Sequence, residues 1–141
     1  MIFDKTLLFS DAQAITATAA STNSIDLGPG GSVYGAAADL ARDVAKSTKI
    51  PLLIQVVEGF NTLTSLTISL ELDTTTTFTP DKTIQLASLP LASLGVGAQV
   101  YYAELPQGIN MRYAQLKYTV VGTNPTLGKI TAGIVAAVQT N

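Results

Sequence analysis

The sequence contains no cysteine, no histidine and no tryptophan among its 141 residues. Without cysteine it can form neither a disulfide framework nor a thiolate metal site. The absence of histidine removes the commonest general base and the commonest ligand of transition metals. A serine or threonine nucleophile would therefore lack its usual activating base. We expect no metal and no cofactor.

Charge is also scarce. Charged residues make up 13% of the chain, against about 25% in average soluble domains. The formal net charge is −2, whereas a nucleic-acid partner calls for a basic footprint, so we expect no nucleic acid. A surface with few charges and a net charge near zero promotes association. The composition therefore favours a protein that buries much of its surface against neighbours.

Long hydrophobic runs are missing. The stretch Ile130–Val138 falls well short of the ~20 residues of a spanning helix, and we expect no membrane segment. The N-terminal region carries only Lys5 and lacks the apolar core of a signal peptide, which predicts synthesis in the cytoplasm. No internal repeat and no compositional break divides the chain, so we expect one domain over residues 1–141.

The sequence is rich in threonine, with 19 residues, and several stretches alternate apolar and polar residues. Threonine is β-branched and suits the half-buried surface of a strand. Over Leu66–Leu72, apolar and polar residues alternate, which places the four apolar residues on one face. Arg112–Val121 alternates likewise. Ile50–Glu58 is a nearly continuous apolar run and predicts a central strand covered on both faces.

Further strands are expected over Lys129–Gln139, Ala98–Leu105, Thr83–Ser88, Ala12–Thr18 and Ser24–Leu27. Glycine- and proline-rich turn signals separate the runs, as in Gly28–Gly31 and Pro106–Gly108. About eight strands joined by short loops are typical of an all-β jelly roll or β-sandwich.

The segment Val33–Val44 is ambiguous. Its apolar residues recur at the spacing of one helical face, and alanine is the best helix former. The segment nevertheless lies in a long connection between strands. A short helix and an irregular loop therefore both remain open.

No motif in the chain predicts catalysis. Gly95-Val96-Gly97 lacks the third glycine and the following helix of a dinucleotide site, and we interpret it as a turn. Glu71 and Asp73 share one face of a strand, as paired catalytic carboxylates would, but we interpret them as a solvated face. Tyr101 and Tyr102 point to opposite faces, which predicts one ring in the core and one on the surface. We expect no enzyme.

Several stretches resemble a capsid cement, or decoration, protein family of Bordetella-type short-tailed bacteriophages: Met1–Thr16, Ser24–Gly28, Gly128–Gly133 and Gln139–Asn141. The similarity runs along the full chain. It implies a jelly roll on the outer surface of the virion capsid that clamps neighbouring major capsid proteins. It also implies a homodimer, made in the cytoplasm of the bacterial host, and no catalytic residues.

Two segments are the candidate contact surfaces. The first is the N-terminal segment, whose apolar residues at a terminus need a surface to cover them: Ile2, Phe3, Leu7, Leu8 and Phe9. The alternative for this segment is an ordinary first strand in the domain's own core. The second is the Gly28–Ala45 connection, with Tyr34 and Leu40, because loops carry function more often than strands. That connection could instead simply cross one end of the sandwich.

Two other functions stay open at this point. A carbohydrate-binding or host-adhesion jelly roll is the main alternative, although such sites gather exposed aromatic residues and this chain has 6% aromatics. An enzyme that uses aspartate or glutamate alone is the other alternative. It would need closely paired carboxylates, and only Glu71 and Asp73 approach that arrangement.

Overall fold

The structure, a computed structural model, describes residues 2–46 and 48–136. In these residues the regular elements are nine strands and one turn of 3-10 helix at Leu91–Ser93. The strands are β1 (Phe3–Ala14), β2 (Ala19–Ala20), β3 (Ile25–Asp26), β4 (Pro51–Glu58), β5 (Leu63–Asp73), β6 (Lys82–Pro90), β7 (Gln99–Glu104), β8 (Tyr113–Gly122) and β9 (Lys129–Val135). The described residues include no helix long and apolar enough to cross a membrane.

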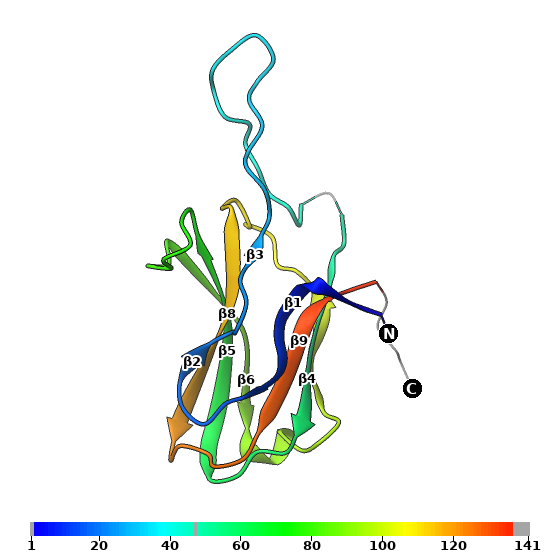
Figure 1. The fold of residues 1–141 in the computed structure, drawn as a ribbon, viewed down its shortest axis with the longest axis vertical. Coiled ribbons are helices and arrows are strands. Elements are labelled where there is room, and N and C mark those ends of the chain that lie inside the picture. Colours follow the sequence, from blue (N-terminus) through cyan, green and yellow to red (C-terminus); the bar gives the residue numbers. More distant parts are fainter. Residues whose placement is uncertain (1, 47, 137–141) are drawn as a thin grey trace.

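The strands form two antiparallel sheets that pack face to face (Figure 1). One sheet has the order β1-β9-β4-β7, and the other has the order β2-β8-β5-β6. The short strands β2 and β3 both pair with β8, so together they occupy one position. Counted this way, each sheet is a layer of four strand positions. Two such layers with these strand orders make a jelly roll. The predicted all-β sandwich is therefore confirmed.

Alternating side chains build the core between the sheets. In β5, Leu66, Ile68, Leu70 and Leu72 are all 0% exposed. They belong to the same cluster as Leu52, Ile54 and Val56 of β4 in the opposite sheet. Burying each such side chain contributes roughly 1.5–3 kcal/mol relative to leaving it in water. The period-two interpretation of β5 is confirmed, as is that of β8, where Leu116 and Tyr118 are fully buried.

The outer face of the β1-β9-β4-β7 sheet carries a smaller apolar cluster. Leu8 and Leu53 both lie opposite Gly133, so the three residues share one face. Gly133 has no side chain, and Leu8 fills that space: a Cβ on the glycine would lie 2.9 Å from Leu8 Cδ2. Leu53 is thereby 0% exposed although it points away from the core. As expected, β4 is a central strand of its sheet. Its two faces are not completely covered, because Val57 near its end is 37% exposed.

Three connections leave the same end of the sandwich. They are residues 27–50 between β3 and β4, residues 74–81 between β5 and β6, and residues 105–112 between β7 and β8. The longest of them, drawn in cyan, extends well beyond both sheets (Figure 1). Any site assembled at this end must therefore come from these connections.

Of the two alternatives left open for Val33–Val44, the helix does not form and the irregular loop is confirmed. The segment is an irregular loop with one antiparallel bridge between Ser32 and Asp39. Gly35 within it has a φ of +82°, in the left-handed region. Helices of this length depend on tertiary packing of their apolar face. Val44 packs against the core, but the part of the segment that projects beyond the sheets finds no such surface.

Other predicted strands form with different bounds. The strand expected over Ala12–Thr18 ends at Ala14, where it belongs to β1. The strand expected over Lys129–Gln139 forms β9 up to Val135, and residues 137–139 lie outside the described residues. Tyr101 packs partly buried against the core and Tyr102 is 60% exposed, as their opposite orientations predict.

A candidate protein interface

Residues 28–45, here called the arm, form the most prominent projection of the molecule (Figure 1). Their outgoing and returning legs are joined by backbone hydrogen bonds. Val33 N donates to Ala38 O at 2.8 Å, and Leu40 N donates to Gly31 O at 2.8 Å. The arm is thus a narrow ribbon of two chain segments with a tip near residues 33–38.

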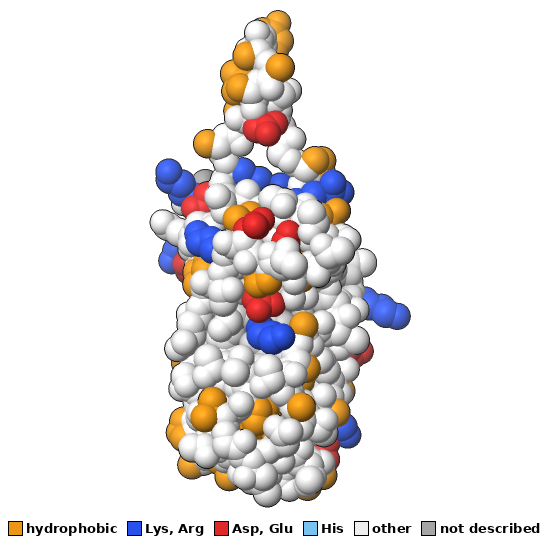
Figure 2. All heavy atoms as spheres, turned by 90° about the vertical axis from the view of Figure 1, so that its left-hand side faces the viewer, with side chains coloured by type: hydrophobic (Ala, Val, Ile, Leu, Met, Phe, Trp, Pro, Cys, Tyr) orange, Lys and Arg blue, Asp and Glu red, His pale blue; other side chains and the backbone are white. Residues whose placement is uncertain are grey.

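The apolar side chains of the arm are exposed to solvent. Tyr34 is fully exposed, Leu40 is 52% exposed and Val33 is 39% exposed. Between Gly28 and Ala41, Asp39 is the single charged residue. Hydrophobic side chains gather at the far end of the projection, whereas charged groups surround its base (Figure 2). An exposed apolar surface of this kind is typical of a contact site.

The outgoing leg is fixed at its base by Asp26, Arg42 and Arg112. Arg112 donates from Nε and Nη2 to the two carboxylate oxygens of Asp26, at 3.0 and 2.8 Å. Asp26 also accepts a bond from Gly28 N at 2.8 Å, and Arg42 donates to the carbonyl oxygens of Gly28 and Leu27. The bonds from Arg112 and then from Gly28 lower the pKa of Asp26.

The returning leg is fixed by Asp43. Its carboxylate accepts bonds from Gly108 N at 2.8 Å and from Ile109 N at 3.3 Å, both in the connection between β7 and β8. Val44 N donates to Ile109 O at 3.1 Å. The backbone bond from Gly108 is the main cause that lowers the pKa of Asp43. We call Asp26, Arg42, Asp43 and Arg112 the neck of the arm.

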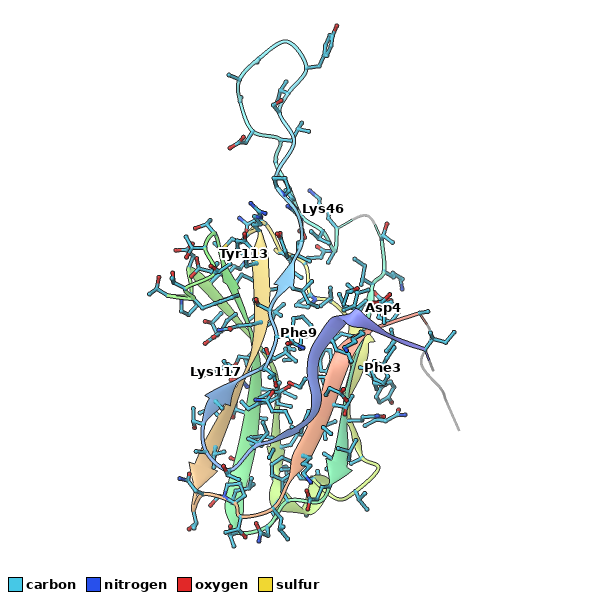
Figure 3. All side chains as sticks on the ribbon, in the orientation of Figure 1. Phe3, Asp4, Phe9, Lys46, Tyr113 and Lys117 are labelled. Carbon is cyan, nitrogen blue, oxygen red and sulfur yellow. The ribbon has the colours of Figure 1, made fainter. Side chains whose placement is uncertain are left out.

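The N-terminal contact candidates differ in burial. Phe9 is 1% exposed and lies between the two sheets (Figure 3), and Leu8 is 9% exposed over Gly133. These two side chains stabilise the domain itself, so their proposed role as contact residues is corrected. Phe3 and Leu7 are partly buried, and Ile2 is 68% exposed. The segment is therefore mainly the first strand of the sandwich, the alternative left open above.

The two contact candidates outside the N-terminal segment, Tyr34 and Leu40, lie together on the arm, far from β1. The residues of the neck were missed. Apart from Gly28 N, which is two positions from Asp26, their partners described above are separated by 14 to 86 positions in the sequence. No local pattern therefore predicts these contacts. Asp26 and Asp43 resemble any other polar residue beside a turn until the jelly roll brings the connections to one end.

The interpretation of Glu71 and Asp73 as a solvated face is wrong for Asp73, which is 2% exposed. Its Oδ1 accepts bonds from Thr75 N at 2.7 Å and Thr75 Oγ1 at 3.1 Å, which shape the turn after β5. Glu71 accepts a bond from Gln115 Nε2 at 2.7 Å. The two carboxylates are thus engaged with different partners. In the described part of the chain no three acidic side chains group as metal ligands would.

The fold and the arm define a class of protein: a small β-sandwich with an exposed apolar surface on a projecting loop. A comparison with protein families identifies the group more closely. The family model Bbp16 matches residues 9–137, and the chain belongs to this family of Bordetella phage proteins. The all-β fold fits a structural protein of the phage. No curated protein matches the sequence.

Proposed function

We propose that this protein is a capsid cement protein that binds the outer surface of the phage capsid and clamps neighbouring major capsid proteins. Its membership of a phage protein family supports a role in the virion. The observation that carries the finer role is the arm, which displays an uncharged apolar tip beyond a rigid sandwich. Such a projection suits contact with a protein surface, and its function requires no catalysis.

The physical basis of cementing is linkage. A protein that binds the closed shell, and does not bind free or dissociated capsid subunits, shifts the equilibrium toward the closed shell. Each contact is modest, but many copies act on one particle. We also propose that the protein acts as a homodimer, as the family resemblance implies, since two arms on one dimer would hold two capsid positions at once.

Cosedimentation tests the proposal. Purified protein is added to capsid shells that lack it, and the bound fraction is measured. In the test variant, residues 32–39 are replaced by Asn-Gly, which closes the ribbon between Gly31 and Leu40 with a tight turn. The control is Leu127→Ser at the opposite end of the sandwich, which removes an exposed apolar side chain outside the arm.

We expect the wild type and Leu127→Ser to bind the shells and the shortened arm to lose binding. Bound shells should also withstand heating better than bare shells. Light scattering of the free protein should give the mass of a dimer. If the wild type ignores shells and instead binds glycans on an array, the adhesion function replaces the cement function.

A further inference from the structure

The tip of the arm contains one large side chain. Seven of the nine residues from Gly30 to Ala38 are glycine, serine or alanine, and the other two are Val33 and Tyr34. Tyr34 is fully exposed, so no other part of the described chain covers its ring. The small neighbours allow the backbone on either side to approach a partner closely. The tip therefore has the shape of a single ring on a thin support.

Tyrosine is well suited to such a position. It buries about 150–250 Å² when covered, and its hydroxyl group finds a hydrogen-bond partner when the ring is buried. It is also one of the residue types enriched among the side chains that dominate binding energy. A ring flanked by small residues matches a narrow cleft better than a flat surface.

The neck and the bridge above it hold the backbone that carries this ring before any partner binds. Asp43 joins the returning leg to the β7–β8 connection, and Arg42 joins it to the outgoing leg. The bridge between Ser32 and Asp39 then holds the two legs together near the tip. A loop that is ordered in advance loses less entropy on binding, so more of the contact energy appears as affinity.

The charge of the tip limits its partner. No residue from Gly28 to Ala38 is charged, so a charged group covered by this tip would lose water without gaining an opposite charge. Four hollows on the described surface, of about 370 to 580 Å³, each include a charged side chain. Their charged members are Glu104 in the first, Asp39, Arg42 and Arg112 in the second, Asp4 in the third, and Lys5 and Asp11 in the fourth. None of these four hollows is therefore an uncharged cleft of the kind that suits Tyr34.

We propose that Tyr34 is the anchor of the cement contact, and this rests on the proposed function. Its ring enters a narrow, uncharged cleft on the outer surface of the capsid shell. The cleft has apolar walls, and an acceptor at its base receives the hydrogen bond of the Tyr34 hydroxyl group. Val33 and the surrounding alanines cover the rim of this cleft and exclude water from it.

Affinity for shells that lack the protein tests this inference, with Tyr34→Ala, Tyr34→Phe and a control, Tyr102→Ala. The control removes the other highly exposed tyrosine ring, on β7. We expect Tyr34→Ala to weaken binding about 30-fold or more, the effect of a dominant contact residue. Tyr34→Phe keeps the ring but leaves the acceptor unpaired, and should weaken binding about tenfold. Tyr102→Ala should bind within about twofold of the wild type.

The outcomes distinguish a failure of the Tyr34 anchor from a failure of the proposed cement function. If the wild type does not bind shells, the proposed function fails and the anchor fails with it. If the wild type binds and Tyr34→Ala binds within threefold, the anchor alone is wrong. Equal affinity of Tyr34→Phe and wild type would overturn the hydrogen bond. Loss of the dimer in Tyr34→Ala, with shell binding intact, would assign the ring to a second copy and overturn the capsid cleft.

Discussion

The sandwich and the arm use similar apolar residues in opposite ways. Leu66, Ile68 and Leu70 in β5 are fully buried, whereas Tyr34 and Leu40 in the arm are at least half exposed. The sandwich is held by hydrophobic burial between two sheets. The arm is held by hydrogen bonds at its neck and by a few backbone bonds along its length. Stability and the proposed recognition are therefore located in different parts of one chain, and substitutions should separate them.

The largest effect on stability is expected in the core. Leu70→Ala removes a fully buried side chain from β5 and should lower the free energy of unfolding by about 2–5 kcal/mol, measured by urea denaturation. The protein that remains folded should bind shells with unchanged affinity, because the arm does not touch Leu70. Loss of shell binding by the folded fraction would show that the two regions are coupled. Leu127→Ala serves as the exposed control, with a change within about 0.5 kcal/mol.

A smaller effect is expected at the buried hydrogen bond between the sheets. Ser10 Oγ of β1 and the hydroxyl group of Tyr118 in β8 lie 2.8 Å apart, and both residues are 0% exposed. Ser10→Ala leaves the tyrosine hydroxyl group without this partner and should cost about 1–3 kcal/mol. Tyr118→Phe should cost less, because Ser10 keeps its bond to Gln13 Oε1 at 2.7 Å.

The double variant sharpens this result. Combining Ser10→Ala with Tyr118→Phe removes both polar groups, so its cost should be smaller than the sum of the single costs. Simple additivity in urea denaturation would contradict the bond. Shell binding should stay unchanged in all three variants.

The smallest effect on global stability is expected at the neck, on acidification. The pKa values of Asp26 and Asp43 are lowered from 3.8 in the folded protein, so their stabilising bonds are present above pH 3.8. These bonds are lost as the pH falls below 3.8 and through the lowered values. Amide signals of Gly28 and Gly108 in NMR spectra should then shift while those of β5 stay in place. Asp43→Asn should remove the transition at Gly108; simultaneous change in β5 would instead mean global unfolding.

The sandwich was largely predictable because its signal is local. In β5 and β8 the alternation of apolar and polar residues repeats over seven or more positions, and a period of two has one structural meaning. The two-residue strands β2 and β3 show no such period, and they are strands only through their pairing with β8. The expected strand over Ser24–Leu27 contains β3, whereas β2 was not predicted.

The arm and its neck were less predictable because their causes are not local. The alanine spacing in Val33–Val44 suits a helix, and only the absence of a nearby surface decides against it. Asp73 looked solvated because nothing in the sequence shows that the following threonine turn covers it. Phe9 and Leu8 looked available at a terminus, but the pairing of β1 with β9 brings them into the domain.

The closeness of the two ends of the arm has a practical consequence. Leu27 N donates to Arg112 O at 2.7 Å and Val44 N donates to Ile109 O at 3.1 Å, so both ends are attached to neighbouring points of one connection. Segments of other lengths can be joined between these points without altering the pairing of any strand. The length of the arm can thus change independently of the sandwich, so a foreign peptide grafted in its place would keep the fold but lose the proposed contact with the shell.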